Sequence, residues 1–186
     1  MNYKVELLEN KKLADPFILE IHYAKRKPSI SFAYGLYDKD ELIGVCTFGS
    51  PASPNLCKGI AGEKNRSKII ELNRLVLKYN RKNEASYLIS KSLKLLPKPK
   101  IVVSYADAAQ NHLGIVYQAS NFYFTGTSKP RTHLAGKNGK HSRHIGDRTK
   151  RVFTSSKHRY VYINANKTDK KQLLKELNYP IMEYPK

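Results

Sequence analysis

The sequence has few cysteines, few acidic residues and no long apolar run, and each shortage excludes a class of protein. Two cysteines in 186 residues, Cys46 and Cys57, are too few for a disulfide framework or a structural zinc site, so a reducing cytoplasm is expected. No apolar run approaches the ~18 residues of a membrane span, and the first residues lack the apolar region of a signal peptide. The sequence therefore predicts one domain, residues 1–186, that is neither secreted nor embedded in a membrane.

Several catalytic motifs are absent as well. The chain contains no HExxH, CxxC or GxSxG, and no Walker A or GxGxxG pattern. The usual zinc hydrolases, NTPases and dinucleotide-binding enzymes depend on these patterns, because each one sets metal ligands, a nucleophile or a phosphate-binding backbone at a fixed spacing. The sequence disfavours all of these classes.

Acidic residues number 15 against 34 Lys and Arg, which gives a net charge of +19. Such an excess favours a polyanionic partner, because each cation placed on a phosphate releases condensed counterions. A solubilising surface, an anionic membrane and ribosomal RNA are the alternatives. The charge is concentrated, since residues 127–159 hold ten Lys or Arg and a single acid. That placement favours a nucleic-acid contact, with Lys25, Arg26 and Lys27 as a second basic group.

Within the basic segment, Lys140–Arg151 also contains His141, His144 and Asp147. A metal-nuclease site is one interpretation, but the Asn and His order that such nucleases use is missing. A basic, glycine-punctuated loop that grips phosphates explains the residues better. The cations of the wider segment expected to contact DNA are Arg131, Lys140, Arg143, Arg148, Lys150 and Arg151.

The hydrophobic pattern predicts a mixed α/β sheet flanked by helices. Strands are expected at 3–8, 31–37, 41–48, 69–77, 101–105, 122–124 and 159–163. Helices are expected at 84–96, 112–120 and 168–177, and from Asp15 to about Ala24, where Asp15 would be the N-cap and Pro16 the first helical residue. Residues 49–62, rich in Pro, Ser and Gly, are expected to form a loop.

Arg74 is the first residue with candidate chemistry, because it lies in the apolar strand IELNRLVL. Alternation places Leu72, Arg74 and Val76 on one face of that strand. Burying an unpaired guanidinium is costly, so Arg74 needs either a salt bridge to Glu71 or Asp107, or an anionic ligand in an open cleft.

A second candidate group ends the strand at 101–105, where Ser104, Tyr105 and Asp107 precede a helix. Open α/β sheets bind ligands at that edge. Asp107 is a candidate general base, a metal ligand or a plain helix N-cap. Tyr117, on the next helix, is either a site residue or a core aromatic.

His22 and Tyr23 form a third candidate group near the end of the first predicted helix. A His–Tyr pair before a basic loop suits metal ligation or a nucleic-acid contact. A lone histidine at a helix end more often stabilises the helix dipole, so composition alone favours that role.

Several segments, in their order along the chain, resemble one family. They are ELIGVCTFGSPAS, ELNRLVL, SYLISKSLKLL, KIVVSYADAAQNHLGIVYQASNFYFTG, KHRYVYI and LNYPIMEYPK. Over roughly Ile21 to Lys186 the chain resembles the Mom-type DNA modification proteins of phages, and the SYAD block is the most specific part. The resemblance implies a single GNAT-like domain, with a mixed, mostly antiparallel twisted sheet flanked by helices and a basic insertion near the C-terminus. It also implies conversion of adenine in DNA to its N6-carbamoylmethyl form. That modification would protect phage DNA from restriction in the host bacterial cytoplasm.

Carried over to matching positions, the resemblance implies site roles for a small set of residues. The implied catalytic residues are Arg74, Ser104, Asp107 and Tyr117. The family is also linked to iron, and the implied ligands His22, Tyr23, Asp107 and Tyr117 offer suitable oxygen and nitrogen atoms.

One departure from the GNAT pattern concerns the cofactor. GNAT proteins hold the pyrophosphate of coenzyme A at a glycine-rich loop after the long strand. Residues 78–84 contain no glycine, so Arg81 and Lys82 would have to hold phosphates by charge. Acetyl-CoA or another donor is therefore left open.

The sequence thus predicts a transferase that modifies N6 of adenine in double-stranded DNA. The base would be extruded from the duplex, with Tyr105, Tyr117 or Tyr123 stacking on it. Arg74 would orient an anionic donor, and Asp107 would accept a proton or hold a metal. The alternatives are an acetyl-CoA-dependent N-acetyltransferase acting on a protein or a small amine, and a non-catalytic nucleic-acid-binding protein. The oligomeric state is not determined, and a homodimer is compatible with the sequence.

Overall fold

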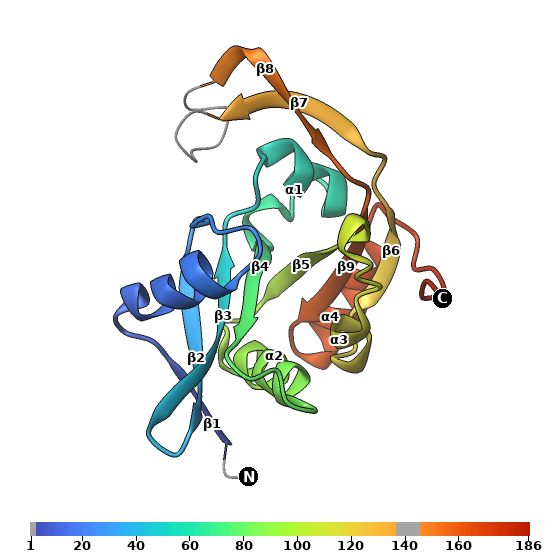
Figure 1. The fold of residues 1–186 in the computed structure, drawn as a ribbon. Helices are drawn as coiled ribbons and strands as arrows, with labels where there is room; N and C mark the ends of the chain where they lie inside the picture. The colour runs from blue at the N-terminus through green and yellow to red at the C-terminus, as the bar shows by residue number, and fades with distance from the viewer. Residues whose placement is uncertain (1–2, 137–145) are drawn as a thin grey trace.

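The computed structural model describes residues 3–136 and 146–186, with the backbone alone for 133–136 and 146–150. Its centre is a seven-stranded sheet in the order β1-β2-β3-β4-β5-β9-β6 (Figure 1). The strands are β1 (Tyr3–Leu7), β2 (Phe32–Asp38), β3 (Glu41–Gly49), β4 (Ile69–Leu77), β5 (Lys100–Asp107), β6 (Tyr123–Thr127) and β9 (Lys157–Asn164). Neighbours are antiparallel except β4 and β5, which are parallel. The predicted mixed, mostly antiparallel sheet is confirmed.

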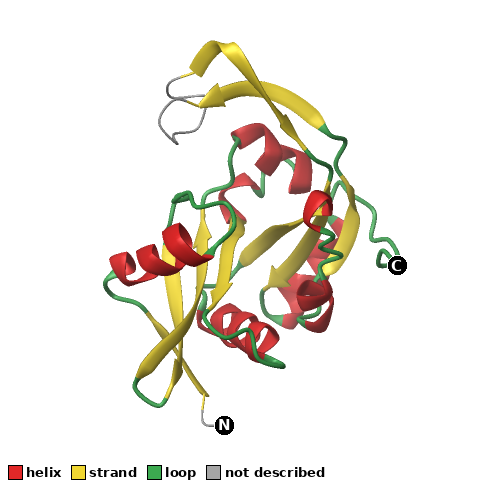
Figure 2. Cartoon of the chain, in the orientation of Figure 1, coloured by secondary structure: helices red, strands yellow, loops and turns green. Residues whose placement is uncertain are grey.

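Helices cover both faces of this sheet (Figure 2). They are α1 (Pro54–Ala61), α2 (Glu84–Leu95), α3 (Ile115–Ala119) and α4 (Lys167–Lys175), with short helical turns η1 (Lys11–Ala14), η2 (Phe17–Ile21), η3 (Arg66–Lys68) and η4 (Ala108–Gln110). No helix in the described ranges has the length and hydropathy of a membrane span.

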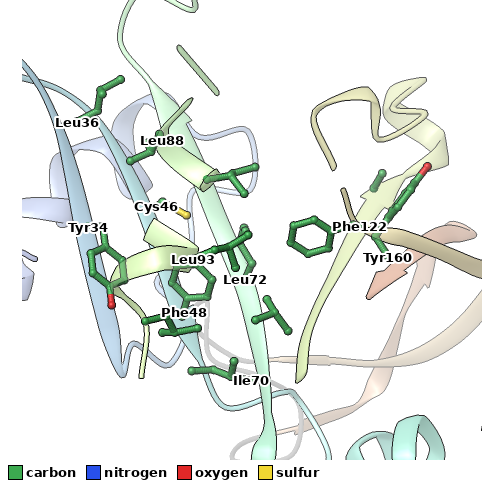
Figure 3. Close-up of a cluster of buried hydrophobic side chains, with 14 of the residues drawn as sticks. Tyr34, Leu36, Cys46, Phe48, Ile70, Leu72, Leu88, Leu93, Phe122 and Tyr160 are labelled. Carbon is green, nitrogen blue, oxygen red and sulfur yellow. The ribbon is translucent and has the colours of Figure 1, made fainter. Parts of the chain in front are cut away.

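The largest core cluster lies between the sheet and α2 (Figure 3). Leu88 and Leu93 of α2 pack there on Phe48 and Leu72 of the sheet, with Phe122 at the far end. The opposite face carries two smaller clusters, one under η1 and η2 and one under α1 and α4. The site described below lies where strands from the middle of this sheet separate.

A β-bulge in β4 changes the predicted alternation. Thr47 of β3 pairs with Arg74 and Phe48 pairs with Leu72, so Asn73 is the extra residue. Thr47 donates to the Asn73 side chain at 2.6 Å, and Asn73 donates to the Ser29 carbonyl at 2.8 Å. The prediction that Leu72 and Arg74 share a face is wrong, because the inserted residue reverses the alternation: Leu72 packs in the α2 cluster, whereas Val76 packs under η2.

The parallel pairing of β4 with β5 ends early. It runs from Ile69–Ile101 to Glu71–Val103 and is not continued, so the strands separate from Leu72 onward. The Leu72 carbonyl is satisfied instead by the Ser104 hydroxyl, which donates at 2.9 Å. This separation brings polar side chains of both strands to the middle of the sheet.

Three local predictions need correction. Residues 49–62 are not a loop throughout, since Ser53 caps α1 and Pro54 takes its first turn. The helix predicted from Asp15 to about Ala24 is only the short turn η2, which ends before His22, and Asp15 is the C-cap of the preceding turn η1 rather than an N-cap. The expected loop at Lys140–Arg151 is in part a strand, β8 (Gly146–Thr154), which pairs with β7 (Arg131–Gly136).

The β7–β8 ribbon forms a sheet of its own, which we call the arm (Figure 1). It extends away from the main sheet on the side of α1. Ser128 and Lys157 close its root by exchanging hydrogen bonds, from the Ser128 amide to the Lys157 carbonyl at 2.9 Å and from the Lys157 amide to the Ser128 hydroxyl at 3.0 Å. The arm therefore leaves the sheet between β6 and β9.

Candidate active site

Arg74 follows the bulged residue Asn73 in β4 and is half-buried. Its two terminal nitrogens donate to the carbonyls of Asn73 at 2.6 Å and Arg26 at 2.8 Å, and its buried Nε has no hydrogen-bond partner. Among the described residues no carboxylate lies within ion-pair distance of Arg74. Burial lowers its pKa, and the nearby Arg26 adds to that effect. An anion bound here would relieve an uncompensated charge.

His22 and Tyr23 lie beside Arg74, at the end of η2. The Ala24 amide donates to His22 Nδ1 at 3.0 Å. Burial, followed by the charges of Arg74 and His112, lowers the pKa of His22 to about 4. The ring is therefore neutral near pH 7 and carries its proton on Nε2. Tyr23 stacks on His22 with ring centroids 4.4 Å apart and meets His112 edge-on at 6.2 Å.

Ser104 and Tyr117 lie on the α2 side of the sheet, beside the point where β4 and β5 separate. Ser104 is fully buried in β5, and Tyr117 on α3 packs against Phe122 and Tyr160 at centroid distances of 5.4 and 5.3 Å. Burial raises the pKa of Tyr117 to about 12, an effect that a hydrogen bond with the Ser104 side chain reduces. Tyr117 is thus a protonated hydrogen-bond donor at neutral pH.

Glu71 is a candidate site residue that the sequence reasoning did not assign, except as a partner for Arg74. It is the last β4 residue paired with β5, and it senses the charges of Arg74 and Lys157. Burial raises the pKa of Glu71 to about 7, although these two cations and the Ala52 amide partly oppose the shift. A carboxyl group with such a pKa exchanges protons readily at neutral pH. The signal available in the sequence was an acid in an otherwise apolar strand.

Asp107 makes its contacts elsewhere, at the root of the arm. It caps η4 by accepting from the Ala109 amide at 3.0 Å, accepts from the Ser155 hydroxyl, and pairs with Lys157 at 2.9 Å. Burial alone would raise its pKa, but the Ser155 and Lys157 hydrogen bonds hold the pKa of Asp107 below its ordinary value. In the described residues it makes no hydrogen bond or ion pair with His22, Arg74 or Tyr117.

The predicted iron ligands do not form a donor set that fits a metal ion. No group of three or more His, Cys, Asp or Glu side chains in the described ranges is placed to hold one. His22 Nδ1 already accepts a hydrogen bond, which leaves the proton on Nε2. The Asp107 carboxylate accepts a hydrogen bond from Ser155 and forms an ion pair with Lys157. Burial keeps Tyr117 protonated.

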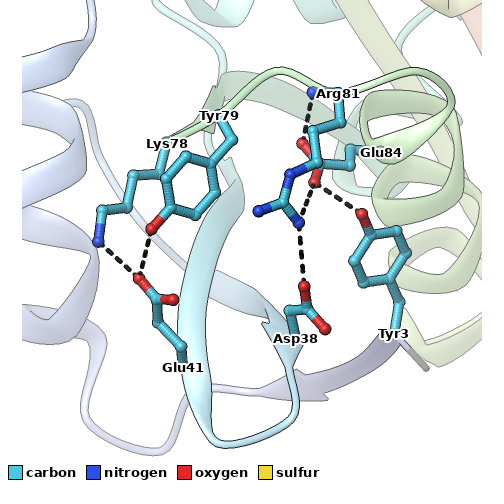
Figure 4. Close-up of polar contacts among 7 residues, drawn as sticks. All are labelled: Tyr3, Asp38, Glu41, Lys78, Tyr79, Arg81 and Glu84. Carbon is cyan, nitrogen blue, oxygen red and sulfur yellow. Dashed lines mark hydrogen bonds and ion pairs between the residues drawn. The ribbon is translucent and has the colours of Figure 1, made fainter. Parts of the chain in front are cut away.

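The residues predicted to hold a coenzyme A pyrophosphate lie at the N-terminus of α2 (Figure 4). The fully buried Glu84 carboxylate accepts there from the Arg81 amide at 2.7 Å and from the Tyr3 hydroxyl at 2.8 Å. The Arg81 guanidinium pairs with Asp38 at 3.0 Å. The protein's own carboxylates thus engage both the amide and the guanidinium of Arg81, and these contacts disfavour a pyrophosphate at the same groups.

Lys78 and Arg81, two cations of the loop before α2, make further contacts within the protein. Lys78 and Tyr79 both donate to Glu41, at 2.5 and 2.9 Å. Arg81 and Lys78 stack over the Tyr79 ring, 4.5 and 5.1 Å from its centroid. Lys82 is exposed. The cofactor roles of Arg81 and Lys82 stay a prediction that these contacts disfavour.

The predicted DNA contacts fall into two places. Lys25, Arg26 and Lys27 are exposed in the loop after η2, where Lys27 pairs with Asp15 at 2.7 Å. Arg131 and Arg151 are exposed on the arm. Arg148 and Lys150 lie in β8, where the backbone alone is described, and Lys140 and Arg143 lie outside the described residues.

Solved structures of acetyltransferases share this architecture. NAA60 of Arabidopsis thaliana, solved with acetyl-CoA, matches 87% of this chain and 98% of its own with a TM-score of 0.56 and 15% identity. A probable acetyltransferase of Staphylococcus epidermidis matches 87% of this chain and 99% of its own (TM-score 0.54, 11% identity). A GNAT-family acetyltransferase of Bacillus cereus matches 88% and 98% (TM-score 0.51, 13% identity). At these identities the likeness shows the fold, and the GNAT-like prediction is confirmed.

Sequence comparison narrows this class to one family. The model of the Mom protein family matches residues 2–186, so the chain belongs to that family. It is 30% identical over 161 residues to the methylcarbamoylase mom of Escherichia phage Mu, which is 83% of this chain and 65% of that protein. The chain therefore spans about two-thirds of that relative's length. The resemblance inferred from the SYAD block is confirmed.

Proposed function

We propose that this protein is a DNA-modifying transferase that places a carbamoylmethyl group on N6 of adenine, and that its active site is the opening between β4 and β5. Membership in the Mom family and the methylcarbamoylase relative support the reaction. The observation that carries the site is Arg74, a half-buried guanidinium with two backbone contacts and no carboxylate partner among the described residues.

Arg74 binds the anionic part of the donor. Its fixed position between the Asn73 and Arg26 carbonyls leaves the rest of the guanidinium for a charge-assisted contact with a carboxylate or phosphate. The occupied N-terminus of α2 argues against a donor held by a coenzyme A pyrophosphate. We therefore place the donor's anionic group at Arg74.

Glu71 accepts the proton that N6 loses as the bond from N6 to carbon forms. The bond from that carbon to the rest of the donor breaks in the same step, and the leaving group departs with the bonding electron pair. The Glu71 pKa of about 7 suits a base that works at neutral pH. Tyr117, which burial keeps protonated, donates a hydrogen bond to the negative charge that develops during the reaction. Ser104 on β5 positions Tyr117 through the hydrogen bond between their side chains and is itself held by the Leu72 carbonyl. His22 offers a second donor at Nε2. Asp107 acts as a positioning residue for the root of the arm rather than as the base.

The DNA partner would be a duplex from which the target adenine is extruded, since N6 is hydrogen-bonded inside the helix. The exposed Arg131 and Arg151 and the cations at 25–27 contact its phosphates. Modified phage DNA in the host cell would then resist restriction endonucleases that read adenine.

The test is mass spectrometry of nucleosides from the DNA of bacteria that express the protein. The proposal expects deoxyadenosine with the added mass of a carbamoylmethyl group, and its loss in the Arg74→Ala variant at equal soluble protein. Phage-infected cells serve as a second host, in case the donor is made during infection. Unmodified deoxyadenosine in both hosts would refute the proposal.

A further inference from the structure

Phe153, on the arm, is exposed in a way that none of the other phenylalanines is. Phe17, Phe48, Phe122 and Phe124 are buried and Phe32 is half-buried, whereas the Phe153 side chain is 69% exposed. Leaving a ring of this size in water forfeits about 1.5–3 kcal/mol of burial energy. Single exposed apolar side chains are common on protein surfaces, so it is the position of this ring on a basic ribbon that points to a partner.

The position of Phe153 on the arm is fixed by its register. It lies opposite Thr132 of β7, and Arg131 lies opposite Thr154. Two residues further on, Ser155 donates to Asp107 at the end of β5, and Lys157 pairs with the same carboxylate at 2.9 Å. Two residues of strand span roughly 7 Å. Phe153 therefore lies at the root of the arm, close to the strand that carries Ser104.

The surroundings of Phe153 identify the chemistry of its partner. Arg151 is two positions away on the same strand, so the two side chains share a face of the ribbon. Arg151 is exposed on this face, whereas the exposed Arg131 pairs with Thr154 and therefore lies on the other face of the ribbon. A second copy of this chain would bring like charges together there, which is unfavourable. A duplex supplies phosphates for the arginines and a stack of bases for the ring, and a two-stranded ribbon fits a DNA groove.

We propose that Phe153 inserts into the base stack of DNA beside the extruded adenine and holds the step open. This inference rests on the proposed function, which requires the adenine to leave the stack. The contacts of Asp107 with Ser155 and Lys157 at the root of the arm position the Phe153 ring. The arginines of the arm bind the phosphates of the DNA backbone on either side of the ring. Apolar side chains that wedge between base steps unstack and kink DNA in this manner.

The experiment compares purified wild-type protein with Phe153→Ala, and with Val152→Ala as the matched control. Val152 is the neighbouring exposed apolar residue, 42% exposed, and it faces the other side of the ribbon. Fluorescence anisotropy of a mixed-sequence duplex over a range of salt gives affinity and salt slope. The same duplex with 2-aminopurine in place of adenines reports unstacking. Circular dichroism and gel filtration check folding and mass.

The proposal expects Phe153→Ala to weaken duplex binding about 5- to 150-fold, the equivalent of one lost stacking contact, with an unchanged salt slope. The 2-aminopurine signal should fall in Phe153→Ala and not in Val152→Ala. Arg151→Ala should instead lower the salt slope by about one. This pattern separates a base-stack contact from a phosphate contact.

Equal affinity and equal 2-aminopurine signal for wild type and Phe153→Ala would overturn the inference. A lower oligomeric mass for Phe153→Ala would also overturn it, because a second copy would then cover the ring. The binding measurements need no catalysis. A Phe153-dependent duplex signal without modified nucleosides would therefore contradict the proposed reaction and leave the DNA contact of Phe153 standing.

Discussion

Replacing Glu71 by Gln should make the protein more stable and less active at the same time. The neutral amide keeps the shape of the side chain and removes the charge that burial disfavours. A residue with a purely structural role would lose stability on substitution. The opposite signs of the two effects therefore distinguish a buried catalytic carboxyl group from a structural one.

The magnitude follows from the pKa of Glu71, about 7 in the folded protein against an ordinary 4.5. The folded state holds this proton more tightly than the unfolded state does. The stabilisation of the folded state by this bound proton is fully present below the ordinary pKa of 4.5. It is lost as the pH rises through about 7. The difference corresponds to at most ~3 kcal/mol at pH 8, which the Glu71→Gln variant should recover in part.

Denaturant unfolding at pH 5 and pH 8 measures the stability, and nucleoside mass spectrometry of DNA from expressing cells measures the activity. We expect wild type to lose stability relative to Glu71→Gln between these pH values, and the variant's modification to fall by about 10²–10⁴, the usual contribution of a general base. Once a purified reaction is available, the wild-type rate should rise with pH through about 7, and Glu71→Gln should lack this rise.

Glu41→Gln is the matched control, because Glu41 is an exposed carboxylate that accepts from Lys78 and Tyr79. Its stability should change by no more than ~1 kcal/mol and its activity should not change. Full modification by Glu71→Gln, or a variant less stable than wild type at pH 8, would refute the role assigned to Glu71.

Three further substitutions test the rest of the site. Arg81→Ala should cost ~1–3 kcal/mol in denaturant unfolding, because it removes the ion pair with Asp38 and the cation beside the buried Glu84. It should leave nucleoside modification unchanged at equal soluble protein, and a large loss of modification would restore the coenzyme A role. Tyr117→Phe should keep the ring packing and reduce modification about 10²-fold, and full activity would exclude the phenol as a donor. Asp107→Asn should cost ~1–3 kcal/mol in denaturant unfolding, because it weakens the contacts of Asp107 with Lys157 and Ser155 at the root of the arm. It should also weaken duplex binding in anisotropy. A loss of modification with full duplex binding would instead make Asp107 a catalytic residue.

The strands and the larger helices could be predicted from local pattern. The continuous apolar run in Glu41–Gly49 and the apolar stripe of Leu88 and Leu93 need no knowledge of the rest of the chain. The helix at Pro54–Ala61 was missed although its signal was present, because Ser53 and Pro54 are a typical N-cap and first-turn pair. The glycines and prolines around it favoured a loop.

The site could be predicted only in part, because its geometry depends on contacts between distant segments. The bulge at Asn73 is held by Thr47 and Ser29, and no pattern within β4 reveals it. Asp107 finds its partner Lys157 fifty residues further along the chain. Glu71 looks like one acid in a strand until the fold buries it. Arg74 was found because a lone guanidinium in an apolar strand requires an explanation from sequence alone.

The central claim is that Arg74, at the opening between β4 and β5, serves a reaction on adenine N6 in DNA. The most direct measurement is the fraction of deoxyadenosine carrying a carbamoylmethyl group at N6, by fragment-ion mass spectrometry, in DNA from cells that hold wild type or Arg74→Ala at equal soluble levels. We predict a clear N6-modified fraction for wild type and none for Arg74→Ala. Equal fractions in the two, or a modification at another atom, would contradict the account.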